Sequence, residues 1–375
     1  MLQTKYAVIG AGLAGAATAW QLARAGHEVT AIEQYDVGHP YGSSHGSARI
    51  FRRVYPQAFY AHLTGRAEAL WHELAAESGA KVLTTTGGLD FGAQRNPRKL
   101  ARVLESLGIY SRLYGAEEAR SLWPQINFDT EVLYQPDAGV IDADLAVRAM
   151  LDLACASGAQ LLSGWPIGSV TPSARGYTLK SPGRPLVHAE TVVVCAGAWL
   201  PEMLPELPLP DAALRALPRL AVTQQQVLHF PVRDLADWPV FVHMGPLQVY
   251  GLPGGRDVDG LAMKVAEHDG GRPTTASGRD GIVDPAARDR LIDYVRTYLP
   301  GLRPTPVAED TCLYTSTPTE DFLIDRIGGI VLVSPCSGHG AKFAPLVGKL
   351  AAGLATGRGR VPAEFTLAGS ALGAL

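Results

Sequence analysis

Cysteine is scarce in this chain, with four residues among 375, and no two of them form a C-x-x-C pair. Four cysteines in a chain of this length do not make the disulfide framework that is typical of small secreted proteins. The sequence therefore predicts a reducing, cytoplasmic environment. We also expect no metal site.

Charged residues are fewer than usual, at 18% of the chain, and the net charge is only −3. So small a net charge gives no sign of a nucleic acid or an anionic membrane as a partner. The low charged fraction suits a large protein with modest surface per residue. With 47% hydrophobic residues, a chain of 375 residues predicts two or so domains around large cores.

Leucine-rich membrane-spanning runs are missing from the N-terminus as well. Residues 6–25 carry little charge, so a signal peptide or membrane span is one interpretation of them. Gly and Ala fill the stretch, however, Gln21 and Arg24 interrupt its end, and no basic region precedes an apolar core. We therefore expect no membrane association.

The N-terminus instead has the order of a nucleotide-binding unit. Residues 6–9 predict a buried strand, Gly10, Gly12 and Gly15 form G-x-G-x-x-G, and residues 16–25 have helix-forming composition. Gly10 allows a tight turn, Gly12 lets the backbone approach a pyrophosphate, and Gly15 lets helix and strand pack closely. The positive end of the helix would favour a diphosphate. An accidental Gly- and Ala-rich helix is the alternative.

The context of this motif strengthens the nucleotide interpretation. Residues 27–32 predict a second strand, which ends at Glu33, 18 residues beyond Gly15. A carboxylate at that place can accept hydrogen bonds from the ribose hydroxyls, and it disfavours a phosphorylated ribose. The pattern predicts FAD or NAD rather than NADP.

Three arginines then fall within five residues, at positions 49, 52 and 53. The small, polar residues 41–48 before them suit backbone that lies against a ligand. A solvated face is the usual outcome for such a cluster. If the segment is helical, however, Arg49 and Arg52 share a face and can form a fork for a phosphate or carboxylate.

The rest of the pattern predicts two kinds of region. Helices are expected at residues 59–79, 97–107, 116–122, 143–157, 284–298 and 345–355. Strands typical of a parallel sheet are expected at residues 189–199 and 330–334, and strands of an antiparallel sheet at residues 220–228, 239–243, 248–252 and 261–265. By themselves, Cys195 and Cys312 are expected to be packing residues and Lys264 a solvent-facing one.

A second glycine-rich turn follows the strand at residues 330–334. Residues 337–343 include Gly338, Gly340 and Lys342 and lead into a helix. Such a turn directs N–H groups and a helix N-terminus toward a ligand, here with a lysine beside them. A carboxylate or the carbonyl edge of a flavin would suit this arrangement.

Together these stretches resemble the monomeric sarcosine oxidase and N-methyltryptophan oxidase family, within the FAD amine oxidases related to D-amino-acid oxidase. The blocks that carry the resemblance are residues 10–15 with Glu33, residues 42–52, residues 312–314 and residues 337–343. The first block is common to many flavoproteins, and the other three are specific to this branch. The resemblance implies an α/β (α+β) fold, with a Rossmann-like FAD-binding domain and a second, mainly antiparallel-sheet substrate domain.

The domains are expected to be interleaved along the chain. Residues 1–85, 140–215 and 310–375 would form the FAD-binding domain, and residues 86–139 and 216–309 the substrate-binding domain. The cofactor-binding positions indicated by the motifs and the resemblance are Gly10, Gly12, Leu13, Ala14, Gly15, Glu33, Ser43, Arg49, Cys312, Gly338, His339, Gly340 and Lys342.

The resemblance also implies roles for single residues. Cys312 matches the family's cysteine that binds the flavin 8α-methyl through a thioether. Arg52 and Lys342 match the pair that holds the substrate carboxylate. Tyr314 would lie by the substrate, with Tyr250 opposite it.

Four further residues receive catalytic roles from the resemblance. Lys264 matches a lysine that activates oxygen over one flavin face, where a positive charge stabilises developing superoxide. Arg49 and His45 match residues lining the flavin, and His268 matches a substrate-side histidine. The implied reaction is oxidation of a secondary (N-methyl or cyclic) amino acid such as sarcosine to an imine, which hydrolyses to amine and aldehyde, with O2 reduced to hydrogen peroxide. A monomer is expected.

Three positions depart from the family pattern. Ala48 stands where relatives carry Thr, Ser44 replaces a His, and Phe241 replaces a Met that lines the substrate pocket. Because of these departures, the sequence does not predict which secondary amino acid is the substrate. Two alternative functions also remain: a dehydrogenase of the same fold with an acceptor other than oxygen, and a non-catalytic flavin-binding protein.

Overall fold

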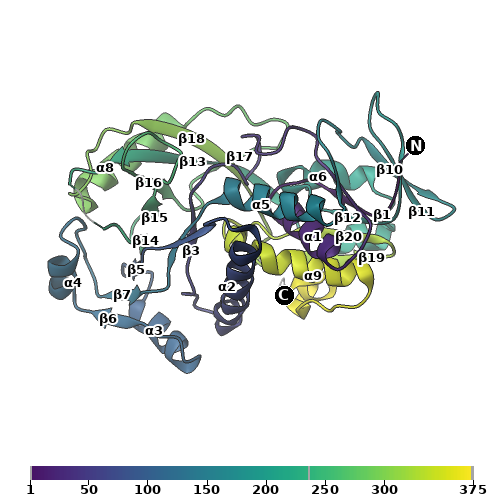
Figure 1. The fold of residues 1–375 in the computed structure, drawn as a ribbon. Coiled ribbons are helices and arrows are strands. Elements are labelled where there is room, and N and C mark those ends of the chain that lie inside the picture. The colour runs from purple at the N-terminus through teal and green to yellow at the C-terminus, as the bar shows by residue number, and fades with distance from the viewer. Residues whose placement is uncertain (1, 235–236, 373–375) are drawn as a thin grey trace.

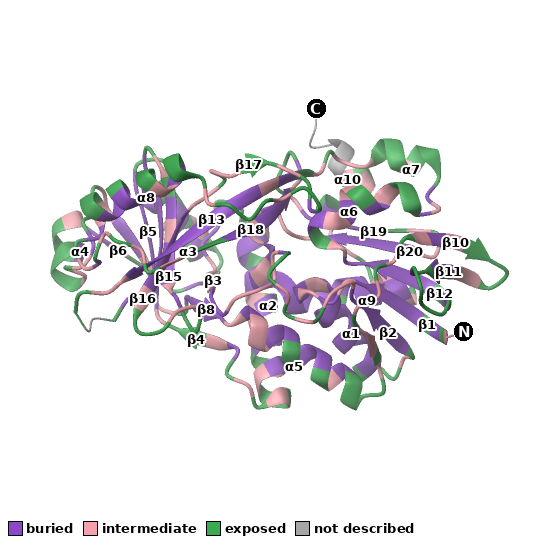
Figure 2. Ribbon diagram, turned by 90° about the horizontal axis from the view of Figure 1, so that it is seen from above, coloured by how far each residue is buried: buried purple, intermediate pink, exposed green. Residues whose placement is uncertain are grey.

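The computed structural model describes residues 2–234 and 237–372. Two large sheets organise these residues, one at each end of an elongated molecule (Figure 1). Most of the long helices pack beside the first sheet, whereas α3, α4 and α8 lie around the second (Figures 1 and 2).

The first sheet has eight strands, in the order β10-β11-β12-β1-β2-β9, with β20 on β12 and β19 on β20. Its strands are β1 (Leu2–Ile9), β2 (Val29–Ile32), β9 (Gln160–Leu162), β10 (Ser169–Ser173), β11 (Gly176–Lys180), β12 (Val187–Val194), β19 (Leu323–Ile327) and β20 (Ile330–Ser334). β1 runs parallel to β2 and β12, and β12 runs parallel to β20. The parallel strands predicted from the apolar runs are confirmed, and antiparallel pairs with β11 and β19 make the sheet mixed.

Apolar side chains from both faces of the parallel strands are buried, which explains why these strands are continuous apolar runs. On one face, Val8 and Val193 pack into a core with the long helices. The helices on that side are α1 (Leu13–Arg24), α2 (Ala58–Ser78), α5 (Ala143–Ala156) and α9 (Ala344–Thr356). On the other face, Ile9 and Ile32 pack against Leu200 of the short α6 (Leu200–Met203).

The second sheet has nine strands, in the order β17-β13-β16-β15-β14-β5-β7-β6, with β18 paired to β13. Its strands are β5 (Gly88–Phe91), β6 (Arg112–Tyr114), β7 (Val132–Gln135), β13 (Ala221–Pro231), β14 (Val240–Met244), β15 (Gln248–Pro253), β16 (Ala262–Glu267), β17 (Arg272–Pro273) and β18 (Ala308–Ser316). The helices at this end are α3 (Pro97–Ser106), α4 (Ala116–Leu122) and α8 (Pro285–Tyr298).

The prediction of a mainly antiparallel second sheet is confirmed, and the sheet contains one parallel pair. β14 runs parallel to β5, with Phe241 level with Leu89. Parallel neighbours need a long crossover connection, and here the intervening chain passes through the first sheet before it returns. Strand periodicity carries no signal for such a pairing.

A small third sheet joins β3 (Arg49–Phe51), β4 (Leu83–Thr85) and β8 (Gly139–Ile141). The helix considered for the arginine segment is therefore wrong: Arg49 begins a strand and Arg52 follows its end. Pairing of Ile50 with Val140 supplies backbone hydrogen bonds that a short exposed helix would lack.

The remaining short elements lie at connections and at the C-terminal side. They are α7 (Asp211–Ala216), α10 (Leu367–Leu372) and the single-turn 3₁₀ helices η1 (Gly197–Trp199), η2 (Leu204–Glu206), η3 (Gly340–Phe343) and η4 (Ala363–Phe365). Within residues 2–234 and 237–372, no helix combines the length and apolarity needed to cross a bilayer.

β13 and β18 form the long ribbon that reaches from the second sheet toward the first (Figures 1 and 2). They pair from Ala221 with Ser316 to His229 with Ala308. Cys312 and Tyr314, two apart on β18, are thereby carried to the region between the sheets. The division into two interleaved domains stays a prediction.

Candidate active site

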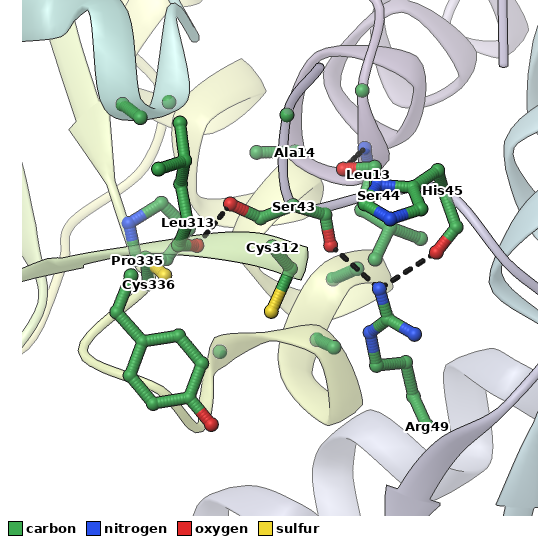
Figure 3. A pocket seen from close by; sticks show the side chains of 18 of the residues that line it. Leu13, Ala14, Ser43, Ser44, His45, Arg49, Cys312, Leu313, Pro335 and Cys336 are labelled. Atoms are coloured by element: carbon green, nitrogen blue, oxygen red, sulfur yellow. Dashed lines mark hydrogen bonds between the residues drawn. The ribbon is translucent and has the colours of Figure 1, made fainter. Parts of the chain in front are cut away.

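A cavity of about 500 Å³ lies between the two large sheets and is lined by residues of both. Ile9 and Val333 line it from the first sheet, and Val242 and Leu252 from the second. We call it the central cavity; Figure 3 shows part of its wall. Its position follows from the topology, since the carboxyl ends of β1 and β12 open toward it.

The first glycine turn forms the wall of the central cavity at the N-terminus of α1. Gly10 has φ +94°, and a Cβ there would lie 2.4 Å from the carbonyl oxygen of Cys195. A Cβ on Gly15 would lie 1.8 Å from the carbonyl oxygen of Gly10, so Gly15 permits close helix–strand packing and does not itself line the cavity. Leu13 N donates to Ser44 Oγ at 3.0 Å. Both expected uses of these glycines, a turn and close packing, are present.

Glu33 lines the same part of the central cavity and is only 5% exposed. Its carboxylate accepts hydrogen bonds from the backbone N–H groups of Ala11, at 2.8 Å, and Tyr35, at 3.1 Å. Burial by itself would raise the pKa of Glu33, but hydrogen bonding from His39 and these two N–H groups outweighs it and holds the pKa below its ordinary value. An ionised carboxylate thus faces the cavity where a ribose was predicted.

Arg49 organises the polar segment before it. The guanidinium donates to the carbonyl oxygens of Ser43, at 3.0 Å, His45, at 2.7 Å, and Ala48, at 2.8 Å (Figure 3). The hydroxyl of Ser43 donates to the carbonyl of Leu313, which ties this segment to β18. The segment is therefore held against the strand that carries Cys312.

Cys312 directs its sulfur into the central cavity beside this segment (Figure 3). It is a free, partly exposed thiol, so core packing does not account for it. Burial of the thiol raises its pKa, and the nearby cations Arg49 and Lys264 act in the opposite direction. Cys195, predicted to be a packing residue, is buried against Thr18 and forms part of the cavity floor.

His45 joins the wall from the same segment. Its Nε2 lies 3.1 Å from Asp310 Oδ2, and its buried Nδ1 has no hydrogen-bond partner in the part of the chain that the structure describes. A polar atom of this kind at a cavity wall is suited to a ligand.

The far end of the central cavity is cationic. Arg52 donates to the carbonyl oxygen of Val54, stacks over the ring of Tyr55 at 5.1 Å and lies 3.9 Å from Asp90. Asp90 is engaged more closely by Arg95, at 2.6 Å, and both of these side chains are buried. Burial first, and then the charge of Arg95, lower the pKa of Arg52.

Lys342 faces this end from η3. Its ammonium donates to Tyr55 Oη at 3.0 Å and to the carbonyl oxygen of His339 at 2.7 Å, and the residue is 5% exposed. Burial and the charges of Arg52 and Arg95 hold the pKa of Lys342 well below its ordinary value. Two cations therefore share a buried region that binding of an anion would stabilise.

A hydrogen-bond relay fixes this lysine. Tyr55 accepts from Lys342, so its own hydroxyl hydrogen is free to be donated to His339 Nδ1, 3.0 Å away. His339 Nε2 lies 3.0 Å from the carbonyl oxygen of Glu320, which assigns the ring hydrogen to Nε2. Burial and the charge of Lys342 lower the pKa of His339 to about 3, so the ring stays neutral.

Lys264 is buried, at 7% exposure, and lines the central cavity. The expectation from strand pattern alone, a solvent-facing lysine, is wrong. Its ammonium donates to Asp257 Oδ2 at 3.2 Å. Burial and the charge of Arg49 lower the pKa of Lys264, and Asp257 opposes them.

Aromatic and imidazole side chains complete the wall near the cations. Tyr250, Tyr314 and His268 all line the central cavity, and the rings of His268 and Tyr314 lie 6.0 Å apart. Burial raises the pKa of Tyr250 to about 12 and that of Tyr314 well above its ordinary value, so both hydroxyls keep their protons. Burial also lowers the pKa of His268.

Phe241 does not line the central cavity. It is fully buried in the core of the second sheet, whereas Val242 and Met244, one and three residues further along β14, line the cavity. Side chains alternate between the faces of a strand, so the register of β14 decides which residues face a substrate. In this chain Phe241 is therefore a core residue and does not line the cavity in which a substrate would lie.

The structure brings nearly all of the predicted site residues to the wall of the central cavity. Those that line it are Gly10, Gly12, Leu13, Ala14, Glu33, Ser43, His45, Arg49, Arg52, Tyr250, Lys264, His268, Cys312, Tyr314, Gly338, His339, Gly340 and Lys342. Sequence reasoning missed Tyr55, Asp90, Arg95 and Asp257. Each contacts a site residue through the fold, and no local motif marks it.

The family model described as FAD dependent oxidoreductase, DAO, matches residues 5–354. The chain belongs to this family. Peroxisomal sarcosine oxidase of Mus musculus is 32% identical to this FAD-dependent oxidoreductase over 368 residues, which cover 92% of this chain and 90% of the relative. Monomeric sarcosine oxidase of Bacillus sp. (strain NS-129) is 28% identical over 368 residues, 93% of this chain and 92% of the relative.

Among solved structures, NikD, an amino acid oxidase of nikkomycin biosynthesis, matches this oxidoreductase with a TM-score of 0.85. The match has 23% sequence identity and covers 96% of each chain, so it shows a shared fold. The predicted resemblance and fold class are both confirmed. In the described residues, no group of three or more His, Cys, Asp or Glu side chains is placed to hold a metal ion.

The central cavity fits the family's FAD. At one end, the glycine turn would provide a backbone cradle and the Glu33 carboxylate an acceptor for the ribose hydroxyls. At the other end, the turn at residues 337–343 offers backbone N–H groups and the Lys342 ammonium, which suit the polar edge of a flavin ring. The partnerless Nδ1 of His45 lies along the same wall.

Proposed function

We propose that this oxidoreductase oxidises a secondary amino acid, N-methylated or cyclic, with sarcosine as the simplest candidate. The imine product would hydrolyse to an amine and an aldehyde, and O2 would be reduced to hydrogen peroxide. The observation that carries the proposal is the pair of cations that line the central cavity together, Arg52, with a side chain 14% exposed, and the buried Lys342. The names of the sarcosine oxidase relatives support the substrate class.

Arg52 and Lys342 suit an amino-acid carboxylate because the acid near Arg52, Asp90, is already paired with Arg95. Asp90 lies 2.6 Å from Arg95 and 3.9 Å from Arg52, so it satisfies Arg52 only in part. Arg52 would supply a planar fork and Lys342 a point charge. An anion bound there would pair with the two cations, whose charges are otherwise only partly compensated, and this pairing stabilises the complex.

FAD, when bound, supplies a two-electron acceptor. The protein's part is to hold the substrate carboxylate with Arg52 and Lys342 and thereby fix the orientation of the carbon that is oxidised. Tyr250, Tyr314 and His268 would enclose the substrate and exclude water. Their lowered or raised pKa values keep all three side chains uncharged near neutral pH, which favours a neutral amine over an ammonium ion.

Lys264 would place a positive charge where oxygen is reduced, and this favours an oxidase over a dehydrogenase of the same fold. A non-catalytic flavin-binding protein would have no use for Lys264, Arg52 and Lys342 together. We further propose that Cys312 carries the flavin through a thioether, because its sulfur faces the cavity. We infer a monomer, since residues of one chain line the central cavity; the cytoplasmic location stays a prediction.

The substrate proposal is tested with Arg52→Gln and a matched control, Arg53→Gln. Arg53 is the next residue and does not line the central cavity; its guanidinium lies 3.7 Å from Glu68. Oxygen uptake is measured with sarcosine, N-methyltryptophan and pipecolate. We expect at least one to be oxidised, with KM raised about 10- to 100-fold in Arg52→Gln and little changed in the control. No oxidation of any secondary amino acid would contradict the proposal.

Covalent attachment is tested by acid precipitation. Yellow colour should stay with the pellet of the wild-type protein and be lost from that of Cys312→Ala. Cys336→Ala is the matched control, because Cys336 is a second free thiol on the same cavity wall. Free FAD in the wild-type supernatant would refute the thioether.

A further inference from the structure

The partly buried carboxylate of Asp257 contacts both Lys264 and Ser47. One carboxylate oxygen accepts from the backbone N–H of Ser47, at 2.5 Å, and from its hydroxyl, at 2.7 Å. The other accepts from Lys264 Nζ at 3.2 Å. One carboxylate therefore connects the hairpin loop between β15 and β16 with the segment that precedes Arg49.

The loop is built for this close approach. Gly255 has φ +62°, and a Cβ there would lie 2.5 Å from Ser47 Oγ. Gly46 has φ +83°, and a Cβ there would lie 3.1 Å from Asp257 Oδ2. The N–H of Arg256 donates to Ser47 Oγ at 2.6 Å. Side chains at either glycine would disturb the carboxylate that meets Lys264.

The guanidinium of Arg256 extends from the same hairpin loop toward solvent and pairs with Asp142. It makes a two-nitrogen contact with Asp142, with a shortest distance of 2.8 Å, and Asp142 also caps α5 by accepting from Leu145 N. This outer ion pair is exposed on the Arg256 side and contributes little by itself. It links the hairpin loop to the N-terminus of α5.

Lys264 needs such a partner, because a buried ammonium is costly without one. The side chains of Lys264 and Asp257 are 9% and 14% exposed. The other groups that act on Lys264 are Arg49, which repels it, the Cys312 thiol, and Asp310. His229 is the cross-strand partner of Lys264, and its Nε2 lies 3.8 Å from Asp257 Oδ2, the same oxygen that accepts from Lys264. Lys264 lines the central cavity and Asp257 does not.

We infer that Asp257 is a positioning residue that keeps the Lys264 ammonium protonated and directed into the central cavity. The carboxylate, fixed by two hydrogen bonds from Ser47, limits the lysine to one side-chain arrangement and stabilises its charged form. The inference rests on the proposed function, in which Lys264 supplies the positive charge for oxygen reduction. It adds that this charge depends on a carboxylate from the hairpin loop.

Removing the carboxylate should shift the pH dependence of oxygen reduction. Without Asp257, Lys264 loses its proton at lower pH, so the charged fraction falls earlier as pH rises. Flavin reoxidation slows above a certain pH, and in Asp257→Asn we expect this pH to be lower by about one unit or more. Above that pH, the variant should reoxidise about tenfold more slowly than the wild type. Reduction of the flavin by substrate should change less than about twofold, because Asp257 does not touch the substrate end.

Two controls separate positioning from general damage. Asp257→Glu keeps a carboxylate and should restore most of the wild-type pH profile. Asp259→Asn makes the same chemical change on the same loop at an exposed residue and should leave both half-reactions unchanged. Should Asp257→Asn fail to fold, Ser47→Ala, which removes one hydrogen bond to Asp257, should shift the profile in the same direction by a smaller amount.

Sulfite binding provides a readout other than turnover. Sulfite adds reversibly to oxidised flavin and bleaches it, and a nearby cation tightens its binding. In the oxidised holoenzyme of Asp257→Asn, the sulfite Kd should begin to rise at a pH about one unit lower than in the wild type. In Lys264→Met this pH step should be absent, and adding Asp257→Asn to Lys264→Met should change nothing further.

The outcomes distinguish the proposed role of Lys264 from the inferred role of Asp257. If Lys264→Met reoxidises as fast as the wild type, the proposed role of Lys264 fails. If Lys264→Met is slow but Asp257→Asn keeps the wild-type profiles for oxygen and sulfite, only the inference about Asp257 is overturned. Equal slowing of both half-reactions in Asp257→Asn, with a lower melting temperature, would also overturn it and leave Asp257 a structural residue.

Discussion

The two ends of the central cavity are built in different ways. The end at Gly10 and Glu33 uses backbone N–H groups, glycines and one carboxylate that lie within a single strand–helix–strand unit. The end at Arg52 and Lys342 uses cations from separate segments that both lie over the ring of Tyr55, and Asp90, which is paired with Arg95, lies 3.9 Å from Arg52. Local chain geometry shapes the first end, and long-range packing of charges shapes the second. We therefore expect steric changes to be decisive at the first end and charge changes at the second.

The largest expected effect is steric, at the glycine turn. In Gly10→Val, a branched side chain at φ +94° would meet the carbonyl oxygen of Cys195, so the turn cannot form as it is. We expect protein without flavin, or no folded protein, measured as the ratio of flavin to protein absorbance after purification. Gly26→Ala is the control, because no atom lies within 4 Å of its Cβ; it should keep full flavin and lose about 1 kcal/mol of stability. Normal flavin content in Gly10→Val would contradict the turn's role.

The next largest effect is electrostatic, at the opposite end. Lys342→Met keeps the length of the side chain but removes a buried cation, so KM for the best substrate should rise about 10- to 150-fold while flavin content stays normal. Steady-state kinetics on protein of known flavin content measures this. Lys349→Met, on the exposed side of α9, should have no effect. An equal loss in both variants would erase the proposed difference between the ends.

A smaller effect is expected at Glu33, because the glycine turn carries most of the cofactor contact. Glu33→Gln retains the shape but removes the charge that accepts from Ala11 and Tyr35. In a Cys312→Ala background, where flavin can dissociate, FAD should bind about tenfold more weakly by fluorescence titration. Glu28→Gln, an exposed acid next to β2, is the matched control. Unchanged FAD affinity would exclude Glu33 from ribose recognition.

The last expected effect is a loss of stability in acid through His339. Its pKa is about 3 in the folded protein, below the ordinary value in an unfolded chain. The unfolded state thus binds a proton first, and stability should fall as pH drops from about 6.5 toward 3 by up to about 1.4 kcal/mol per pH unit. His339→Gln should flatten that part of the curve in urea unfolding experiments, whereas His62→Gln, exposed on α2, should not. Parallel curves for the wild type and His339→Gln would refute a neutral buried ring.

How far the sequence reaches differs between these regions. The unit from Tyr6 to Glu33 was predictable because its contacts join residues that are close in the chain, and strand, turn and helix each leave a local pattern. Local patterns predicted that Lys264 faces solvent and that Cys312 packs in a core. The family resemblance instead predicted that both residues belong to the site. Phe241 shows the limit of such a transfer, since it lies one step out of register from the cavity-facing side of β14.

The sequence by itself determined the nucleotide-binding unit, the long helices and the central strands of the two large sheets, and the chemical types of the site residues. Only the tertiary structure decided that β5 pairs in parallel with β14, that Arg95 occupies Asp90, and that Asp257 meets Lys264. The physical reason is range. Backbone turns and amphipathic periods are local, whereas the pairing of buried charges depends on which distant segments the packed sheets bring together.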